Sequence, residues 1–192
     1  VSVTDPNEVR LTGENSFIRL APAEGQDETT RTSHWRILAS PAGPGHTLFL
    51  TSELTDNEIG IYSDNIALAR WLQEEIESLL HPPFADQDIP VIDAEFSKSG
   101  DGRSFWTEAV DSLEGTITLT WYDFGEPYML SAAPGDMPGI PLGVYSCLTP
   151  ARRAQVTIDD RVASGTPVPE AMGDVQSSTA CLAWSETWVR PA

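Results

Sequence analysis

RSFWTEAVDSLEGTITLTWY, residues 103–122, contains two stretches in which apolar and polar side chains alternate, separated by a short turn before Gly115. A period of two is typical of a β-strand that buries one face. The same period recurs along most of the chain, in short stretches bounded by Gly, Pro and Asp. We therefore expect strands at 8–12, 16–20, 33–39, 46–53, 57–62, 90–97, 103–110, 115–122, 127–133, 142–148, 153–159 and 180–189.

One segment, DNIALARWLQEEIESLLHPP (64–83), departs from the strand period. Its apolar residues recur at helical spacing; they are Leu68, Leu72, Ile76 and Leu79. Asp64 is a candidate N-cap, and the two prolines at 82–83 end the helix. We expect a helix at about 65–80, with a solvent-facing side that carries Arg70, Gln73, Glu74 and Glu77. Many short strands with one amphipathic helix predict a mainly β protein, an antiparallel barrel-like or sandwich domain.

The length and the charge of the chain limit the classes of function that are expected. A chain of 192 residues with 40% hydrophobic residues is long enough for one globular domain, 1–192. Its formal charge of −18 argues against nucleic-acid and membrane partners, which attract basic surfaces. The first residues lack the basic and apolar regions of a signal peptide, so we expect a cytoplasmic protein, with a cleaved signal as the alternative.

Two cysteines, Cys147 and Cys181, are too few for a disulfide framework and belong to no CxxC pair. We expect buried free thiols, with a single bridge as the alternative. No nucleophile elbow, Walker A sequence or dinucleotide fingerprint is present, and no motif identifies a family. The sequence therefore predicts a protein without an organic cofactor.

A trial register for the strands between 90 and 122 suggests a candidate site. A four-residue turn, 99–102, places Phe96 opposite Phe105, and a turn at 111–115 adds Ile117 to the same apolar face. On the other face Asp93 then lies opposite Glu108. Like charges that oppose each other across a sheet are destabilising unless a function compensates.

This second face supplies the predicted site. We assign catalytic roles to Asp93, Glu108 and Tyr122, and substrate binding to Glu95, Trp106, Thr118 and Thr120. Opposed carboxylates split their pKa values, so that one serves as general base and the other as general acid, while the tyrosine hydroxyl stabilises an oxyanion. The alternative is an ordinary solvated face, which most antiparallel sheets have.

The leading hypothesis is a cofactor-independent acid–base enzyme of lyase, isomerase or hydrolase type that acts on a small polar molecule. The first alternative is a small-molecule or carbohydrate-binding module without catalysis, and the second is a structural or assembly subunit. Homo-oligomers are compatible with all three. We expect no metal; a divalent cation held by Asp93, Glu95 and Glu108 is the alternative, because hard cations prefer oxygen ligands.

Two further stretches bear on this site. Residues 123–126, DFGE, read as a turn that pairs 115–122 with 127–133, with both carboxylates at the solvated tip. On the last strand four residues share a face by period two: Trp184, Glu186, Trp188 and Arg190. We expect the aromatic residues in the core and Glu186 paired with an arginine. The alternative is that this face borders the same cleft as Trp106 and supplies a second aromatic wall.

Overall fold

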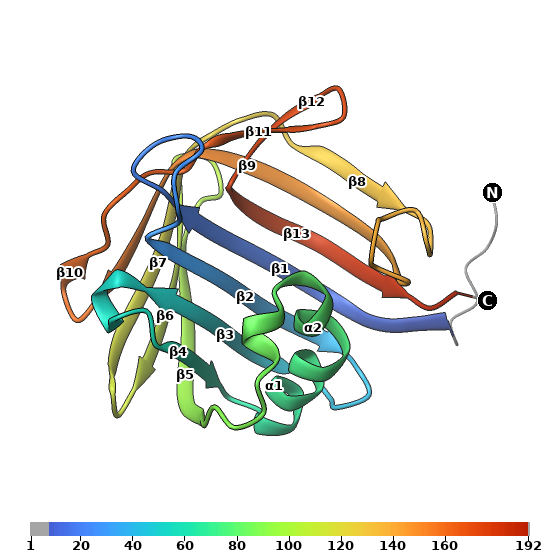
Figure 1. Ribbon diagram of the computed structural model, residues 1–192, viewed down its shortest axis with the longest axis horizontal. Coiled ribbons are helices and arrows are strands. Elements are labelled where there is room, and N and C mark those ends of the chain that lie inside the picture. Colours follow the sequence, from blue (N-terminus) through green and yellow to red (C-terminus); the bar gives the residue numbers. More distant parts are fainter. Residues whose placement is uncertain (1–7, 192) are drawn as a thin grey trace.

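The computed structural model describes residues 8–191. Within this range, nine strands close into a mixed barrel, in the order β9-β13-β1-β2-β3-β4-β5-β6-β7 and back to β9 (Figure 1). All neighbours around the barrel are antiparallel except β4 and β5, which are parallel. The prediction of a mainly β, barrel-like protein with one helix is confirmed.

The barrel strands are β1 (Val9–Leu20), β2 (Thr30–Ala39), β3 (Gly45–Ser52), β4 (Ile59–Ser63), β5 (Val91–Gly100), β6 (Phe105–Ser112), β7 (Gly115–Phe124), β9 (Gly143–Ile158) and β13 (Ala180–Val189). Outside the barrel path lie β8 (Tyr128–Ala132), β10 (Arg161–Val162), β11 (Pro169–Met172) and β12 (Val175–Ser178). The expected strands are all present, although 8–12 and 16–20 form the single strand β1, and 142–148 and 153–159 the single strand β9. The short strands β10, β11 and β12 were not predicted.

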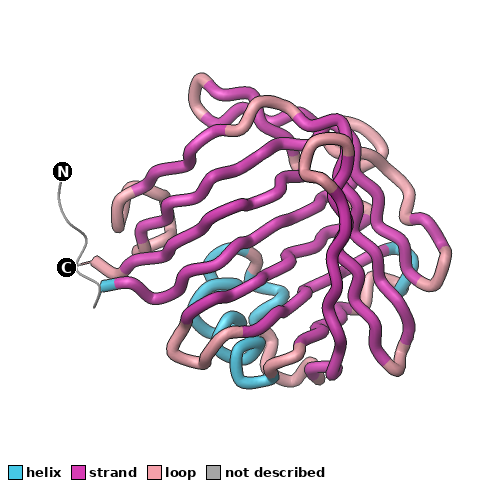
Figure 2. Tube along the Cα trace, turned by 180° about the vertical axis from the view of Figure 1, so that it is seen from behind, coloured by secondary structure: helices cyan, strands magenta, loops and turns pink. Residues whose placement is uncertain are grey.

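The helical segment connects β4 to β5 on the outside of the barrel. It consists of α1 (Ile66–Leu72), a π-helical segment (Gln73–Glu77) and α2 (Ser78–Leu80). Short 3₁₀ turns lie at Glu53–Thr55 and Pro82–Ala85. Figure 1 shows the helices in front of the sheet, and Figure 2 shows the strands from behind with the helices on the far side.

The predicted apolar stripe of the helix is confirmed: Leu68, Leu72 and Ile76 are fully buried, and Leu79 packs beside them. The predicted solvent side is wrong for Gln73 and Glu77, which are also buried. The π-helical segment changes the number of residues per turn, so these two side chains rotate toward the barrel. The N-cap is Asn65, whose side chain accepts a hydrogen bond from the backbone N–H of Leu68, rather than Asp64.

Leu72→Ala tests this packing. The side chain is fully buried between the helix and the barrel, so its truncation should lower the free energy of unfolding by about 2–5 kcal/mol. Urea denaturation of both proteins measures the loss. An unchanged midpoint would contradict the packing of the helix against the barrel.

Two apolar cores stabilise the fold. One fills the barrel interior and includes Leu48, Leu119 and Trp121. The other lies between the barrel wall and the helix and includes Trp35 and Phe49. The part of the barrel that lies under the helix therefore buries side chains on both of its faces. Polar side chains near the ends of its strands become buried together with these apolar ones.

Both cysteines are free thiols, as expected; the expected burial is confirmed for Cys181 and wrong for Cys147, which is half-buried. In the described part of the chain, no helix has the length and apolar character that crossing a membrane requires.

The predicted registers of β6 are wrong. Phe96 pairs with Val110 rather than Phe105, because the last pair of the ladder is Gly100 with Trp106. This pair encloses five residues, 101–105, instead of the four expected at 99–102. Gly100 enters this loop with φ +123°, where a Cβ atom would lie 2.5 Å from the carbonyl oxygen of Phe105. The turn from β6 to β7 has two residues, 113–114, instead of five.

Both turn lengths differ from the predicted ones by an odd number of residues. An odd shift of the register moves the side chains of a strand to the other face of the sheet. β6 is therefore flipped relative to the prediction, whereas β5 and β7 keep their predicted apolar face toward the barrel interior.

The predicted hairpin from β7 to β8 is also wrong. β7 pairs with the second half of β9, and β8 pairs with the first half of β9. Asp123 adopts φ +55° and forms an ion pair with Arg152, which is exposed. The DFGE stretch turns the chain away from β7 instead of folding it back.

Candidate functional site

The flip of β6 divides the predicted site residues between the two faces of the barrel wall. Trp106 and Glu108 point into the barrel, in line with Val110 on the same strand. The outer face carries Glu95, Tyr122, Thr118 and Thr120. The Tyr122 hydroxyl donates a hydrogen bond to Gln155, and Thr120 bonds to Thr107. Asp93 does not oppose Glu108; it pairs with Ser63 on β4.

A polar cluster occupies the end of the barrel where Trp106 and Glu108 lie. It comprises Glu14 on β1, His34 and Arg36 on β2, His46 on β3 and Glu108 on β6. The Arg36 guanidinium binds the Glu14 carboxylate and lies 3.8 Å from Glu108. Arg36 therefore joins strands on opposite sides of the barrel mouth.

Glu108 is a buried carboxyl group with limited compensation. Burial raises its pKa, against the opposing effects of a 2.8 Å hydrogen bond from the Trp106 indole and the charge of Arg36. Burial also raises the pKa of Glu14. A carboxyl group held in this way can exchange a proton nearer neutral pH than a solvated one.

His34 lies deeper in the cluster. Burial lowers its pKa to about 3, with added repulsion from His46 and Arg36, so the ring is neutral at neutral pH. The ring packs 5.8 Å from Phe96. Its Nε2 atom is buried and has no hydrogen-bond partner among residues 8–191.

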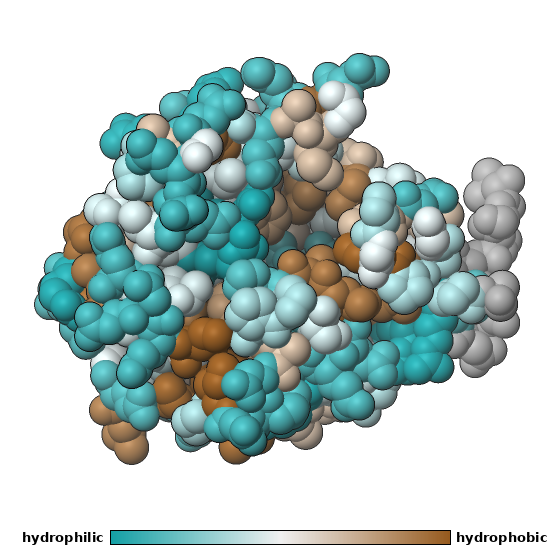
Figure 3. All heavy atoms as spheres, viewed as in Figure 1, coloured by the Kyte–Doolittle hydropathy of each residue, from teal (hydrophilic) through white to brown (hydrophobic). Residues whose placement is uncertain are grey.

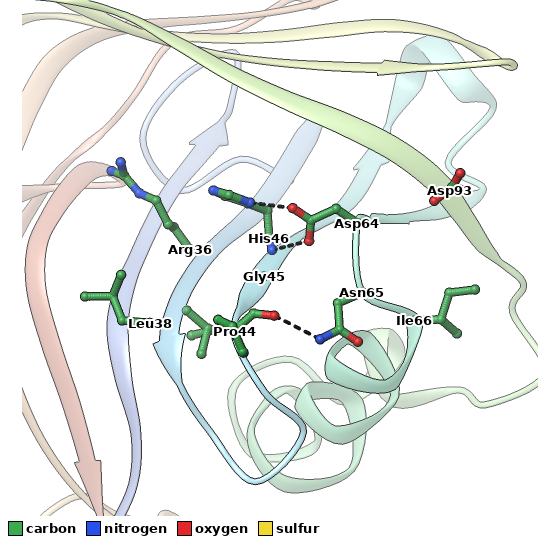
Figure 4. Close-up of a pocket in the computed structure, with 10 residues that line it drawn as sticks. Arg36, Leu38, Pro44, Gly45, His46, Asp64, Asn65, Ile66 and Asp93 are labelled. Carbon is green, nitrogen blue, oxygen red and sulfur yellow. Dashed lines mark hydrogen bonds and ion pairs between the residues drawn. The ribbon is translucent and has the colours of Figure 1, made fainter.

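His46 and Asp64 form a dyad at the surface of this cluster. The His46 Nδ1 atom lies 2.7 Å from one Asp64 carboxylate oxygen, and the His46 backbone N–H donates to the other at 2.6 Å. The ring stacks on Phe96, 5.1 Å away. Donation from Nδ1 to the carboxylate leaves Nε2 as an acceptor, and Figure 4 shows this nitrogen on the Arg36 side of the ring.

The dyad opens onto a groove of about 760 Å³ at the barrel mouth (Figure 4). Its polar lining includes Arg36, His46, Asp64 and Asp93, and its apolar lining includes Leu38 and Ile66. Leu38 is 71% exposed, so this side of the groove offers apolar surface directly to solvent.

The face predicted for the last strand is wrong: of its residues, Trp184 borders Trp106, whereas Trp188 lies in the core and Glu186 forms no ion pair with an arginine among residues 8–191. The ring of Trp184 lies 5.2 Å from that of Trp106 in an edge-to-face arrangement, and the Lys98 ammonium lies 5.7 Å above Trp106. A β-bulge between Ala183 and Ser185 interrupts the period of two. As a result Trp188 belongs to the core under the helix, on the other side of the wall from Trp184.

The structure thus brings Trp106 and Glu108 together beside Arg36. It places Asp93 in the lining of the groove, across from Arg36 (Figure 4), and leaves Glu95, Tyr122, Thr118 and Thr120 on the outer face. No group of three or more His, Cys, Asp or Glu side chains within residues 8–191 is placed to hold a metal ion. The sequence assigns no catalytic or binding role to Glu14, His34 or Arg36, and predicts a helix cap at Asp64. From the sequence, His46 opens a strand after Gly-Pro-Gly; a capping or solvent role is the leading expectation there, and the lining of a barrel mouth the alternative.

A comparison with family models, curated proteins and solved structures found no match to this chain.

Proposed function

We propose that the barrel mouth is the active site of a cofactor-independent acid–base enzyme, of lyase, isomerase or hydrolase type, that acts on a small polar molecule. The observation that carries the proposal is the His46–Asp64 dyad, because a carboxylate on Nδ1 orients the ring and stabilises the imidazolium that forms when Nε2 takes a proton. With its −18 charge the chain suits a small molecule better than a nucleic acid.

In this proposal His46 is the general base, and Asp64 positions it. Arg36 lines the same groove and supports negative charge that develops on a substrate oxygen. Glu108, whose pKa is raised by burial, holds the second proton beside Arg36. The proposed acid–base pair is thus an imidazole and a carboxyl group, His46 and Glu108, instead of the two opposed carboxylates expected from the sequence. The two free thiols fit a reducing compartment, and we propose the cytoplasm.

A second candidate function, a small-molecule or carbohydrate-binding module, is favoured by the surface around the cluster. Trp184 remains 37% exposed beside Trp106, and Leu38 and Ile66 are exposed at the groove. Exposed aromatic faces bind sugar rings and other flat molecules without any proton transfer.

Proton NMR in D₂O distinguishes the two functions. A panel of small 2-oxo acids, hydroxy acids, hydroxy ketones and esters is incubated with the protein. An acid–base enzyme should exchange or transfer a proton of at least one compound, which appears as a lost or new resonance. His46→Gln should reduce that rate by about 10²-fold or more, since a positioned general base contributes about that much.

Glu95→Gln is the matched control, because Glu95 is exposed on the outer face, and its rate should equal that of the wild type. A full rate in His46→Gln would disprove the assigned base. Compounds that shift the Trp106 and Trp184 indole resonances without reacting would favour the binding module instead.

A further inference from the structure

A second cavity lies on the outside of the barrel, between the helical segment and strands β1 and β2. Its volume is about 200 Å³, and its polar lining includes Asn15, Ser33, Glu77 and His81. Phe17, Leu80 and Phe84 provide apolar walls. Figure 3, which views this side of the molecule, shows the surface hollowed above the helices. The barrel mouth described above is a separate site and shares no lining residue with this cavity.

Glu77 is the acidic group of the cavity, and its two carboxylate oxygens differ. Oε1 accepts hydrogen bonds from the Ser33 hydroxyl at 2.6 Å and from the Trp35 indole at 2.7 Å. Among residues 8–191, Oε2 has no hydrogen-bond partner, and it is not among the atoms sealed from solvent. The side chain as a whole is only 1% exposed. Donors from β2 thus fix the carboxylate and leave one oxygen for a ligand in the cavity.

A second buried carboxyl group, Glu186, interacts with Glu77 and adds negative potential when it is ionised. Glu186 on β13 accepts a 2.6 Å hydrogen bond from the Trp188 indole, and the Trp188 ring lies 6.4 Å from that of Trp35. Within residues 8–191, neither Glu77 nor Glu186 forms an ion pair. Two buried carboxylates without a cation are costly, and a positive ligand would lower that cost.

The two arginines that also line the cavity, Arg19 and Arg31, do not neutralise Glu77, because each is paired with another carboxylate. Arg31 binds Glu28 at 2.8 Å, and Arg19 binds Glu170 at 2.7 Å. Burial lowers the pKa of His81, which keeps its ring neutral at neutral pH. The free oxygen of Glu77 is therefore the main charge available to a molecule that enters.

We propose that this cavity binds a small organic cation, an ammonium or amidinium group on a compact apolar body. The cation hydrogen-bonds to Oε2 of Glu77, with Asn15 and Ser33 beside it, and the apolar body packs between Phe17, Leu80 and Phe84. A benzene-sized body suits the volume, since cavities of about 150 Å³ bind benzene.

Calorimetric titration with benzamidinium tests the proposal, with benzamide as a neutral molecule of the same shape. Benzamidinium should bind at one site, and benzamide about tenfold more weakly or worse, because it lacks the charge-assisted bond. Glu77→Gln should reduce benzamidinium affinity by a similar factor while Gln still accepts the bonds from Ser33 and Trp35. Glu74→Gln, on the exposed side of the same helix, is the control and should bind like the wild type.

An NMR measurement and a second variant test the same site if Glu77→Gln does not fold. Binding should shift the Trp35 indole N–H resonance, because that group bonds to the same carboxylate. Leu80→Trp, which fills the cavity and retains Glu77, should abolish binding if Glu77→Gln does not fold. Equal affinity for benzamide, full affinity in Leu80→Trp, an unmoved Trp35 resonance or no binding at millimolar benzamidinium would each overturn the proposal. His46→Gln should bind benzamidinium normally, so this result is independent of the barrel mouth.

Discussion

Replacing Arg36 with methionine is expected to lower the free energy of unfolding by about 3–5 kcal/mol at neutral pH, the usual cost of removing one partner from a buried ion pair. Arg36 binds Glu14 and lies 3.8 Å from Glu108, and all three side chains are largely buried. Methionine keeps most of the side-chain volume, so the loss of stability reports the removal of the positive charge rather than the opening of a cavity. Urea denaturation of both proteins at pH 7 gives the difference.

The pH dependence of the stability lost in Arg36→Met shows whether the missing charge causes it. Burial raises the pKa values of Glu14 and Glu108, and removal of Arg36 should raise them further. As pH falls both groups become neutral in the folded variant, and the cost of the missing cation should shrink. Lys98→Met, which removes an exposed cation nearby, should cost little at either pH. An equal loss for Arg36→Met at pH 4 and pH 7 would point to packing instead.

Glu186→Gln should become more stable relative to the wild type as the pH rises. Burial raises the pKa of Glu186 from its ordinary value of 4.5 to about 7, against the hydrogen bond from Trp188. Between these two values the folded state binds this proton more tightly than the unfolded state, so wild-type stability falls as pH rises. The total over this window is about 3 kcal/mol, and Gln, which does not titrate, avoids it.

Denaturant unfolding of the two proteins at steps from pH 4 to pH 8 measures this difference. The two profiles should separate above pH 4.5 and run parallel again above pH 7. Glu126→Gln, an exposed carboxylate, should follow the wild type throughout. Parallel profiles for Glu186→Gln and the wild type would show that Glu186 ionises as readily in the folded protein as in the unfolded chain.

Strand positions could be predicted from the sequence because most strands present a clearly apolar face and a clearly polar one. β6 does not: Phe105, Thr107 and Ala109 form one face, and Trp106, Glu108 and Val110 the other, each with one aromatic residue and one small apolar residue. Only the loop lengths decide which face turns inward. These depend on Gly100 and Asp101, whose carboxylate accepts backbone bonds from Arg103 and Ser104 and shapes the five-residue loop.

Only part of the candidate site could be predicted from the sequence. Trp106 and Glu108 were singled out as chemically unusual, and they do lie in the polar cluster. His46 and Asp64 were harder to find, because they flank the pair formed by Thr47 and Ser63 at the ends of β3 and β4. Pairing β3 with β4 in the sequence would have placed the two side chains together. The burial of Glu77 could not be predicted, because a regular helix would have placed it in solvent.

The position of β1 has a consequence for how the protein is made. β1 lies between β2 and β13, and Val9 pairs with Val189, which is 180 residues later in the sequence. During synthesis, hairpins such as β2–β3 and β6–β7 can form as soon as they leave the ribosome. One edge of β1 pairs with β2, but its other edge waits for β13, which is translated after all the other strands described here. Its open edge is exposed throughout that time, which makes the nascent chain prone to mispairing and a client for chaperones until β13 emerges.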